Sequence, residues 1–279
     1  MKRSNKASPA WQFSGSGLRL IALSYLVLLV VLPLSAIFYD GFREGLFTFL
    51  ENILRPSAWA ALKLSLWTAA VMALFNGMMG TLTAYVLVRY DFWGKSFLNT
   101  IVDLPFAIPS LVTGVMLVAL YGPEGFLGEF LQEGLGLRIL FAPPAIVIAL
   151  LFINFPVVVR SVQPVLEELD PSQEEAAATL GASPWRIFRS VIFPAIRPAT
   201  WTGVLLSFAR ALGEFGAVVV VAGNLPLFSQ TAAVYVWGEI ESENRLGASA
   251  MSIVLLAVSF LLVLLVDWLQ TRRRAVHAT

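Results

Sequence analysis

A charged segment interrupts an otherwise apolar chain between Glu174 and Pro198, with the sequence EEAAATLGASPWRIFRSVIFPAIRP. Two carboxylates, Glu174 and Glu175, precede three alanines, so a helix here would carry charge beside a surface without bulky side chains. Such a surface lets another protein approach the backbone closely, and docking is therefore the chemistry that this segment could perform. A solvated loop whose acids and arginines pair with one another explains the same charge pattern and stays open as an alternative.

Capping signals in and just before this segment predict two short helices. Asp170 can cap the first helix, with Pro171 at the first helical position. Gly181 suits the left-handed residue that commonly follows the end of a helix. Ser183, which precedes a proline, marks the start of the second helix.

The composition is that of an integral membrane protein. The 279 residues are 58% hydrophobic and only 13% charged, and the mean hydropathy is +0.78, far above the value of a soluble domain. The net charge of +1 gives no strongly basic face for nucleic acid. Cysteine is absent and the one histidine, His277, lies in a polar tail, so the sequence predicts no metal site, no disulfide and no catalytic triad. The GKS sequence at 94–96 lacks the earlier glycine of a phosphate-binding loop, and ATP binding by this chain is not predicted.

Six apolar segments are long enough to cross a bilayer, for which about 20 residues are needed. The second is longer than the hydrocarbon requires, so we expect it to tilt or to project into water. The first follows basic residues and could also be a signal peptide, but its apolar run exceeds the usual length for one and favours an uncleaved helix. The predicted spans are Leu18–Phe38, Ala58–Val88, Ile101–Tyr121, Pro143–Gln163, Ala199–Ala222 and Ala248–Trp268.

Two charged residues fall inside the fifth predicted span. Arg210 and Glu214 are four residues apart, so on a continuous helix they share one face. Intramembrane charges are costly unless they pair or line a polar cavity. The two residues could form a structural ion pair, or Arg210 could bias a translocation path towards an anion while Glu214 prevents binding too tight for release. Ser207 could offer a hydroxyl to that anion, and Gly213 either thins the helix there or allows close packing.

Prolines indicate where helices end or bend. Pro194 and Pro198 are expected to end the second short helix before the fifth span begins. In the sequence DLPFAIPS, at 103–110, Pro105 and Pro109 each remove a backbone hydrogen bond and are expected to kink the third span. Shaping of the helix is the first interpretation of these prolines, and a gate is the second. Asp103 is expected to be a solvated residue at the membrane boundary.

The distribution of lysine and arginine predicts that both termini are cytoplasmic. With that orientation the cytoplasmic side holds 13 of these residues and the opposite side 5, apart from Arg210 within a span, which satisfies the positive-inside rule. The chain then consists of an N-terminal tail at 1–17, one membrane domain at 18–268 and a C-terminal tail at 269–279. The charged segment belongs to a cytoplasmic loop at 164–198.

The charged segment resembles the cytoplasmic signature of the permeases of ATP-binding-cassette (ABC) importers. That signature is Glu-Ala-Ala, three residues, Gly, nine residues and then Ile-x-Leu-Pro. Val191 and Phe193 replace its isoleucine and leucine, which are apolar for apolar changes. The resemblance implies a type I ABC importer permease fold in which this loop forms a coupling helix that docks on a separate ATPase subunit. The matching residues are Glu175, Ala176, Ala177, Gly181 and Pro194, with Glu174 beside them.

Four other sequences are similar to the T-type permease of bacterial sulfate/thiosulfate importers: FNGMMG at 75–80, DLPFAIPS at 103–110, QPVLEEL at 163–169 and ARALGEFGAVVVVAGN at 209–224. The resemblance implies sulfate or thiosulfate translocation across the bacterial inner membrane by alternating access. It also implies a W-type partner permease, an ATPase dimer that binds ATP and magnesium, and a periplasmic sulfate/thiosulfate-binding protein, with no cofactor in this chain. A molybdate or tungstate permease is the alternative, since LGEFGA occurs there as well. A secondary anion transporter is a further, less favoured alternative. It would need coupling carboxylates in discontinuous helices, and only the pair Arg210 and Glu214 lies clearly inside a predicted span.

Overall fold

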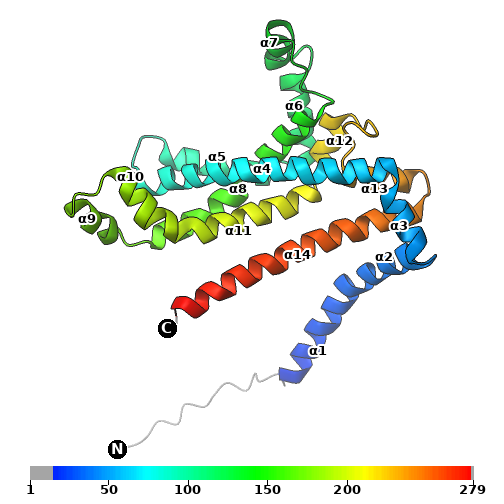
Figure 1. Cartoon of the computed structure of the whole chain (residues 1–279), viewed down its shortest axis with the longest axis horizontal. Coiled ribbons are helices and arrows are strands. Elements are labelled where there is room, and N and C mark those ends of the chain that lie inside the picture. Colours follow the sequence, from blue (N-terminus) through cyan, green and yellow to red (C-terminus); the bar gives the residue numbers. More distant parts are fainter. Residues whose placement is uncertain (1–14, 278–279) are drawn as a thin grey trace, which may run out of the picture.

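The computed structural model describes residues 15–277, which are helical without a strand (Figure 1). This confirms the predicted all-α fold. Most of the predicted tail at 1–17 lies outside the described residues, and helix continues into the predicted tail at 269–279 as far as His277. The α-helices are α1 (Gly15–Leu26), α2 (Leu32–Phe42), α3 (Leu46–Leu54), α4 (Pro56–Arg89), α5 (Lys95–Ala107), α6 (Ser110–Tyr121), α7 (Phe126–Leu135), α8 (Pro143–Glu168), α9 (Ser172–Thr179), α10 (Pro184–Ile187), α11 (Phe193–Leu212), α12 (Gly216–Ala222), α13 (Ala232–Glu241) and α14 (Arg245–His277), with π-helical turns at Val27–Val31 and Phe188–Ile192.

Four of the six predicted spans correspond to continuous helical runs. In the described part of the chain, five runs are long and apolar enough to cross a membrane: Gly17–Phe42, Pro56–Arg89, Pro143–Glu168, Pro184–Leu212 and Arg245–Trp268. The second has 34 residues, a length of roughly 50 Å at 1.5 Å per residue. It therefore exceeds the hydrocarbon core of about 30 Å, as expected from the sequence.

The third predicted span is not one kinked helix. Its two halves, α5 and α6, meet at 109°, a bend far larger than a proline kink within a continuous helix. Ile108 is extended, with φ −86° and ψ 126°, because the residue before a proline avoids the helical region. Pro109 is extended as well. The α5 half packs on α8, whereas α6 packs on α12.

The fifth predicted span differs at both ends. Its helix begins at Pro184 and runs to Leu212, so Pro194 and Pro198 do not end the preceding helix. The wide π-helical turn before Phe193 removes the clash that a proline ring makes with an earlier carbonyl, and Pro194 then occupies the first turn of α11. The predicted continuation to Ala222 is a separate short helix, α12.

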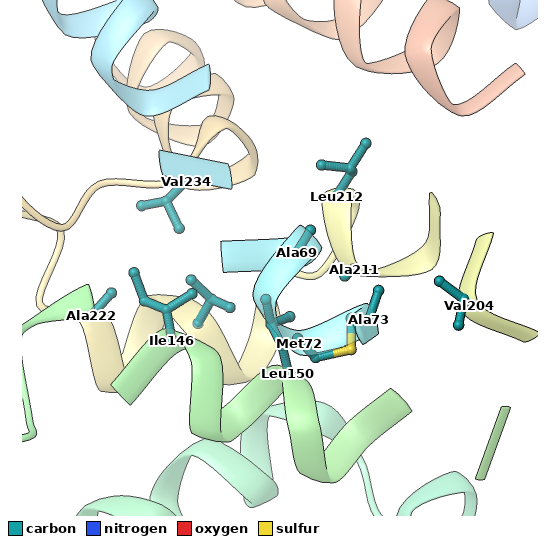
Figure 2. Packing of buried hydrophobic residues seen from close by; sticks show 11 residues of the cluster. Ala69, Met72, Ala73, Ile146, Leu150, Val204, Ala211, Leu212, Ala222 and Val234 are labelled. Atoms are coloured by element: carbon teal, nitrogen blue, oxygen red, sulfur yellow. The ribbon is translucent and has the colours of Figure 1, made fainter. Parts of the chain in front are cut away.

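The core is the contact between α4, α8 and α11. Glycines bring these helices together, since a Cβ atom at Gly77 would lie 2.6 Å from Val204 Cγ2, and one at Gly80 would lie 2.9 Å from Val158 Cβ. Apolar side chains fill the remaining space, among them Met72 of α4 and Leu150 of α8 (Figure 2). The charged loop and the break after α11 are thus continuous with helices of this core.

The N-terminal span lies at the edge of the bundle. Among the described residues it approaches the other helices mainly where α2 packs on α14, and α14 in turn packs along α11 (Figure 1). None of the most apolar window of Gly17–Phe42 is buried within the chain. At the far side of the molecule, α6 carries α7 away from the bundle.

Candidate coupling loop and transport path

The first helix of the charged segment is capped as the sequence predicts. The Ser172 N–H donates a hydrogen bond of 2.9 Å to Asp170 Oδ1, and α9 begins at Ser172. This backbone hydrogen bond holds the pKa of the Asp170 carboxyl below its ordinary value. The carboxylate is therefore ionised at neutral pH and stabilises the start of the helix.

A left-handed glycine ends α9. Gly181 has φ +79°, and its N–H donates to the Ala178 carbonyl at 2.9 Å. A Cβ atom there would meet nothing within 4 Å, so only the backbone conformation requires glycine. After the turn, Ser183 Oγ accepts the Arg186 N–H at 3.4 Å and caps α10. The two predicted helices of the loop are both present.

The two adjacent carboxylates have different environments. Glu174 Oε1 accepts a hydrogen bond of 2.8 Å from Arg89 Nε, at the end of α4, and Arg89 also donates to the Leu169 carbonyl at 3.2 Å. Glu174 is only partly exposed, whereas Glu175 faces solvent. Within the described residues no ion pair joins these acids to the arginines of the same segment. Glu174 thus anchors α9 to the membrane domain, and Glu175 is free for an outside contact.

The exposed surface of α9 consists mostly of small side chains, with one large apolar side chain at its C-terminal end. Ala176 and Gly181 are exposed and Ala177 partly so, and Leu180 follows with 89% of its surface exposed. Leu180 is thus the large apolar side chain beside these small residues. Pro194, the last residue of the matched signature, is also exposed but lies in α11, beyond the loop helices.

An aromatic cluster beneath the loop was not predicted from the sequence. The rings of Trp185 and Phe188 stack with centroids 5.7 Å apart, and Tyr85 of α4 meets Phe188 edge-on at 5.7 Å. Phe193 continues the cluster. Since Tyr85 lies one helical turn from Arg89, both the ion pair and the rings connect the loop to the same end of α4.

Asp103, expected to be a solvated boundary residue, has 48% of its side chain exposed but is also paired. Both of its carboxylate oxygens accept hydrogen bonds from Arg160 of α8, at 2.7 and 2.5 Å. Arg160 also donates to the side-chain and backbone oxygens of Asn99. A bidentate guanidinium–carboxylate contact is geometrically specific, so this clamp fixes α5 against α8 on one side of the broken third span.

Arg210 and Glu214 do not form the structural ion pair that was one of the two interpretations of their spacing. Helix α11 ends at Leu212 and Gly213 caps it with φ −93° and ψ 1°, so the two side chains do not share a helical face. Glu214 Oε1 instead accepts the Ala217 N–H at 3.2 Å, at the start of α12. Arg210 is exposed, and its Cζ atom lies 5.7 Å from the ring centroid of Phe106.

Ser207 lies inside the helix packing, and its hydroxyl is bonded within its own helix. The residue is fully buried, and its hydroxyl donates to the Val204 carbonyl of its own helix at 2.9 Å. Of the four candidate path residues, Arg210, Glu214 and Gly213 therefore lie at or beside the break after α11, and Ser207 does not. Among the described residues, no group of three or more His, Cys, Asp or Glu side chains could hold a metal ion.

In the part of the chain that the structure describes, these features amount to a helical bundle with five or six candidate membrane spans and a solvent-facing loop that Arg89 joins to α4. The chain belongs to the family of binding-protein-dependent transport system inner membrane components, whose sequence pattern matches residues 76–275. That range includes the loop and both broken helices. Family membership makes this chain a transport subunit rather than an enzyme, as the sequence predicted.

Similar proteins cover nearly the whole chain. The sulfate transport system permease protein CysT of Escherichia coli (strain K12) is 40% identical over 251 residues, which are 90% of each chain. A probable sulfate transport system permease protein of Prototheca wickerhamii is 41% identical over 88% of this chain and 96% of its own length. In three dimensions, a bacterial ABC transporter involved in alginate import matches 94% of this chain and 96% of its own with a TM-score of 0.78 at 17% identity. The predicted ABC importer permease fold is thereby confirmed.

Proposed function

We propose that this chain is the T-type permease subunit of an ABC importer that translocates sulfate, and with it thiosulfate, by alternating access. The observation that carries the proposal is about 40% identity to sulfate permeases over nine-tenths of the chain. Because the similarity covers about nine-tenths of this chain and of the relative, it concerns the whole permease and not one shared motif. Molybdate or tungstate remains the competing substrate class.

The coupling function is assigned to the segment from Glu174 to Gly181. Its exposed face docks on an ATPase subunit, and Glu174 transmits the movement because Arg89 ties it to α4. The ATPase dimer binds ATP and magnesium, and this chain binds no cofactor. In this proposal the chain lies in the bacterial inner membrane with both termini cytoplasmic, beside a W-type permease and below a periplasmic sulfate/thiosulfate-binding protein.

The path is assigned to the break between α11 and α12. Arg210 is exposed there, and within the described residues it makes no ion pair. An unpaired guanidinium attracts a tetrahedral dianion and offers several N–H donors to its oxygens. Glu214 lies four residues further on, beyond the end of α11, and limits the positive potential, so the anion is held weakly enough to be released.

Uptake into proteoliposomes that contain the complete transporter tests the proposal. We expect ATP-dependent uptake of labelled sulfate that excess thiosulfate reduces and excess molybdate affects little. If the transporter took up molybdate in preference to sulfate, molybdate would be the substrate and the sulfate assignment would be wrong. Uptake driven by a proton gradient without ATP would replace the ABC mechanism with secondary transport.

A further inference from the structure

Two helix breaks that are distant in the sequence lie against each other. The break between α5 and α6 is at Ile108 and Pro109, and the break between α11 and α12 is at Gly213–Phe215. A side chain at Gly216 would collide with Ser110 and would lie 3.0 Å from the Leu111 nitrogen. One helical turn further along α6, Gly114 is in the same close contact with α12. The two breaks therefore form a single junction, visible where α6 and α12 adjoin (Figure 1).

One side chain from each break meets at this junction. Phe106 is the penultimate residue of α5 and is 50% exposed, and Arg210 lies in the last turn of α11. The guanidinium lies over the ring, with 5.7 Å between Cζ and the centroid, within the range of a cation–π contact. The described residues provide Arg210 with no carboxylate partner, since Glu214 accepts the Ala217 N–H.

Contact with a ring restrains a guanidinium without consuming its hydrogen-bond donors. A carboxylate would neutralise Arg210 and occupy those donors, whereas an aromatic face does neither. Phe106 itself is held in place because the clamp between Asp103 and Arg160 fixes α5 one turn earlier. The clamp, the ring and the cation thus form a connected series of contacts from α8 to the junction.

We propose that Phe106 is a positioning residue that orients Arg210 to bind a tetrahedral oxyanion at the junction of the two helix breaks. The inference rests on the proposed transport function, and it adds Phe106 as the residue that holds the Arg210 guanidinium in an orientation suited to binding the oxyanion. Phe106 does not contact the anion in this arrangement. It reduces the number of orientations that Arg210 adopts, so that less side-chain entropy is lost when the anion binds.

A double-mutant cycle on the complete reconstituted transporter separates this role from ordinary packing. Phe106→Leu should lower labelled sulfate uptake about threefold to tenfold, the range given by an exposed to partly desolvated cation–π contact. Phe106→Trp, which offers a stronger ring face, should rescue uptake. In the Arg210→Met background, Phe106→Leu should cause no further loss, because the ring has no cation left to orient.

Phe97→Leu is the matched control, since Phe97 is an exposed phenylalanine on the same helix; it should leave uptake unchanged. Equal losses from Phe106→Leu with and without Arg210, at equal amounts of assembled complex, would overturn the positioning role and show that the ring acts by itself. If the wild-type transporter takes up molybdate and not sulfate, the proposed substrate is wrong, and the same cycle scored by molybdate uptake still decides the role of Phe106.

Discussion

At the scale of single residues, adjacent side chains of one motif serve different contacts. Glu175 matches the glutamate of the signature, but it is the adjacent Glu174 that reaches Arg89 at the end of α4. The partner lies 85 positions earlier in the chain, and no local pattern indicates such a contact. The two helices of the loop could therefore be predicted from local signals, whereas the attachment of the loop to the membrane domain required the structure.

The ion pair between Arg89 and Glu174 is expected to be needed for coupling. Glu174→Gln should lower ATP-driven uptake and increase proteolytic cleavage in α9, because a charge-assisted hydrogen bond in a partly buried site contributes about 1.5–3 kcal/mol. Exchanging the charges, as Arg89→Glu with Glu174→Arg, should restore part of the uptake. Glu175→Gln is the control for the neighbouring carboxylate, and it should leave cleavage in α9 unchanged. Unaltered cleavage in the Glu174 variant would show that the pair does not anchor the loop.

Because Arg210 and Glu214 are not paired, we expect a different sulfate uptake from the variant in which both charges are removed. Were they a buried ion pair, Arg210→Met with Glu214→Gln would recover much of what either single change loses. Because helix α11 ends between them and Glu214 accepts a backbone N–H, the double variant should take up sulfate as poorly as Arg210→Met alone. Uptake and the amount of assembled complex are measured separately. Near-normal uptake by the double variant would remove Arg210 from the path.

At the scale of elements, hydropathy predicted which segments are apolar but not where they break. The third span is apolar from Ile101 to Tyr121, and hydropathy averages over the turn at Ile108 and Pro109 that separates α5 from α6 by 109°. For the fifth span, Gly213 was interpreted as thinning the helix or allowing close packing, and the end of α11 at that point was not predicted. Capping signals succeeded where they were strong, at Asp170, Gly181 and Ser183 in the loop, because each satisfies identifiable backbone groups.

The end of α9 is expected to depend on the backbone of Gly181. Gly181→Val should reduce ATP-driven uptake strongly while the chain still inserts, because a β-branched residue at φ +79° is strained. Gly134→Val is a matched control, since a Cβ atom there also meets nothing within 4 Å but its φ is not positive. Uptake is measured against the amount of inserted protein. Undiminished uptake by the Gly181 variant would separate the loop geometry from coupling.

At the scale of the whole molecule, large apolar surfaces of this chain lack an internal partner. The span Gly17–Phe42 buries none of its most apolar window, and a groove of about 430 Å³ runs between α4 and α11. Leu74, Leu82 and Trp201 line this groove and are exposed. Lipid can cover such surfaces, but the exposed Arg210 needs a polar surrounding that lipid does not provide. A second membrane chain opposite the helix breaks would enclose it.

The functional transporter is therefore expected to contain two different permease chains and two ATPase subunits. One bundle of this size presents its helix breaks on a single side, and a path for an anion requires a facing wall. Each permease would supply one docking loop, so the number of ATPase subunits should equal the number of permease chains. Native mass spectrometry of the purified complex measures this composition directly. A complex of one membrane chain with one ATPase would contradict the arrangement. A complex with two copies of this chain would still enclose the path between two permeases, but it would exclude the W-type partner.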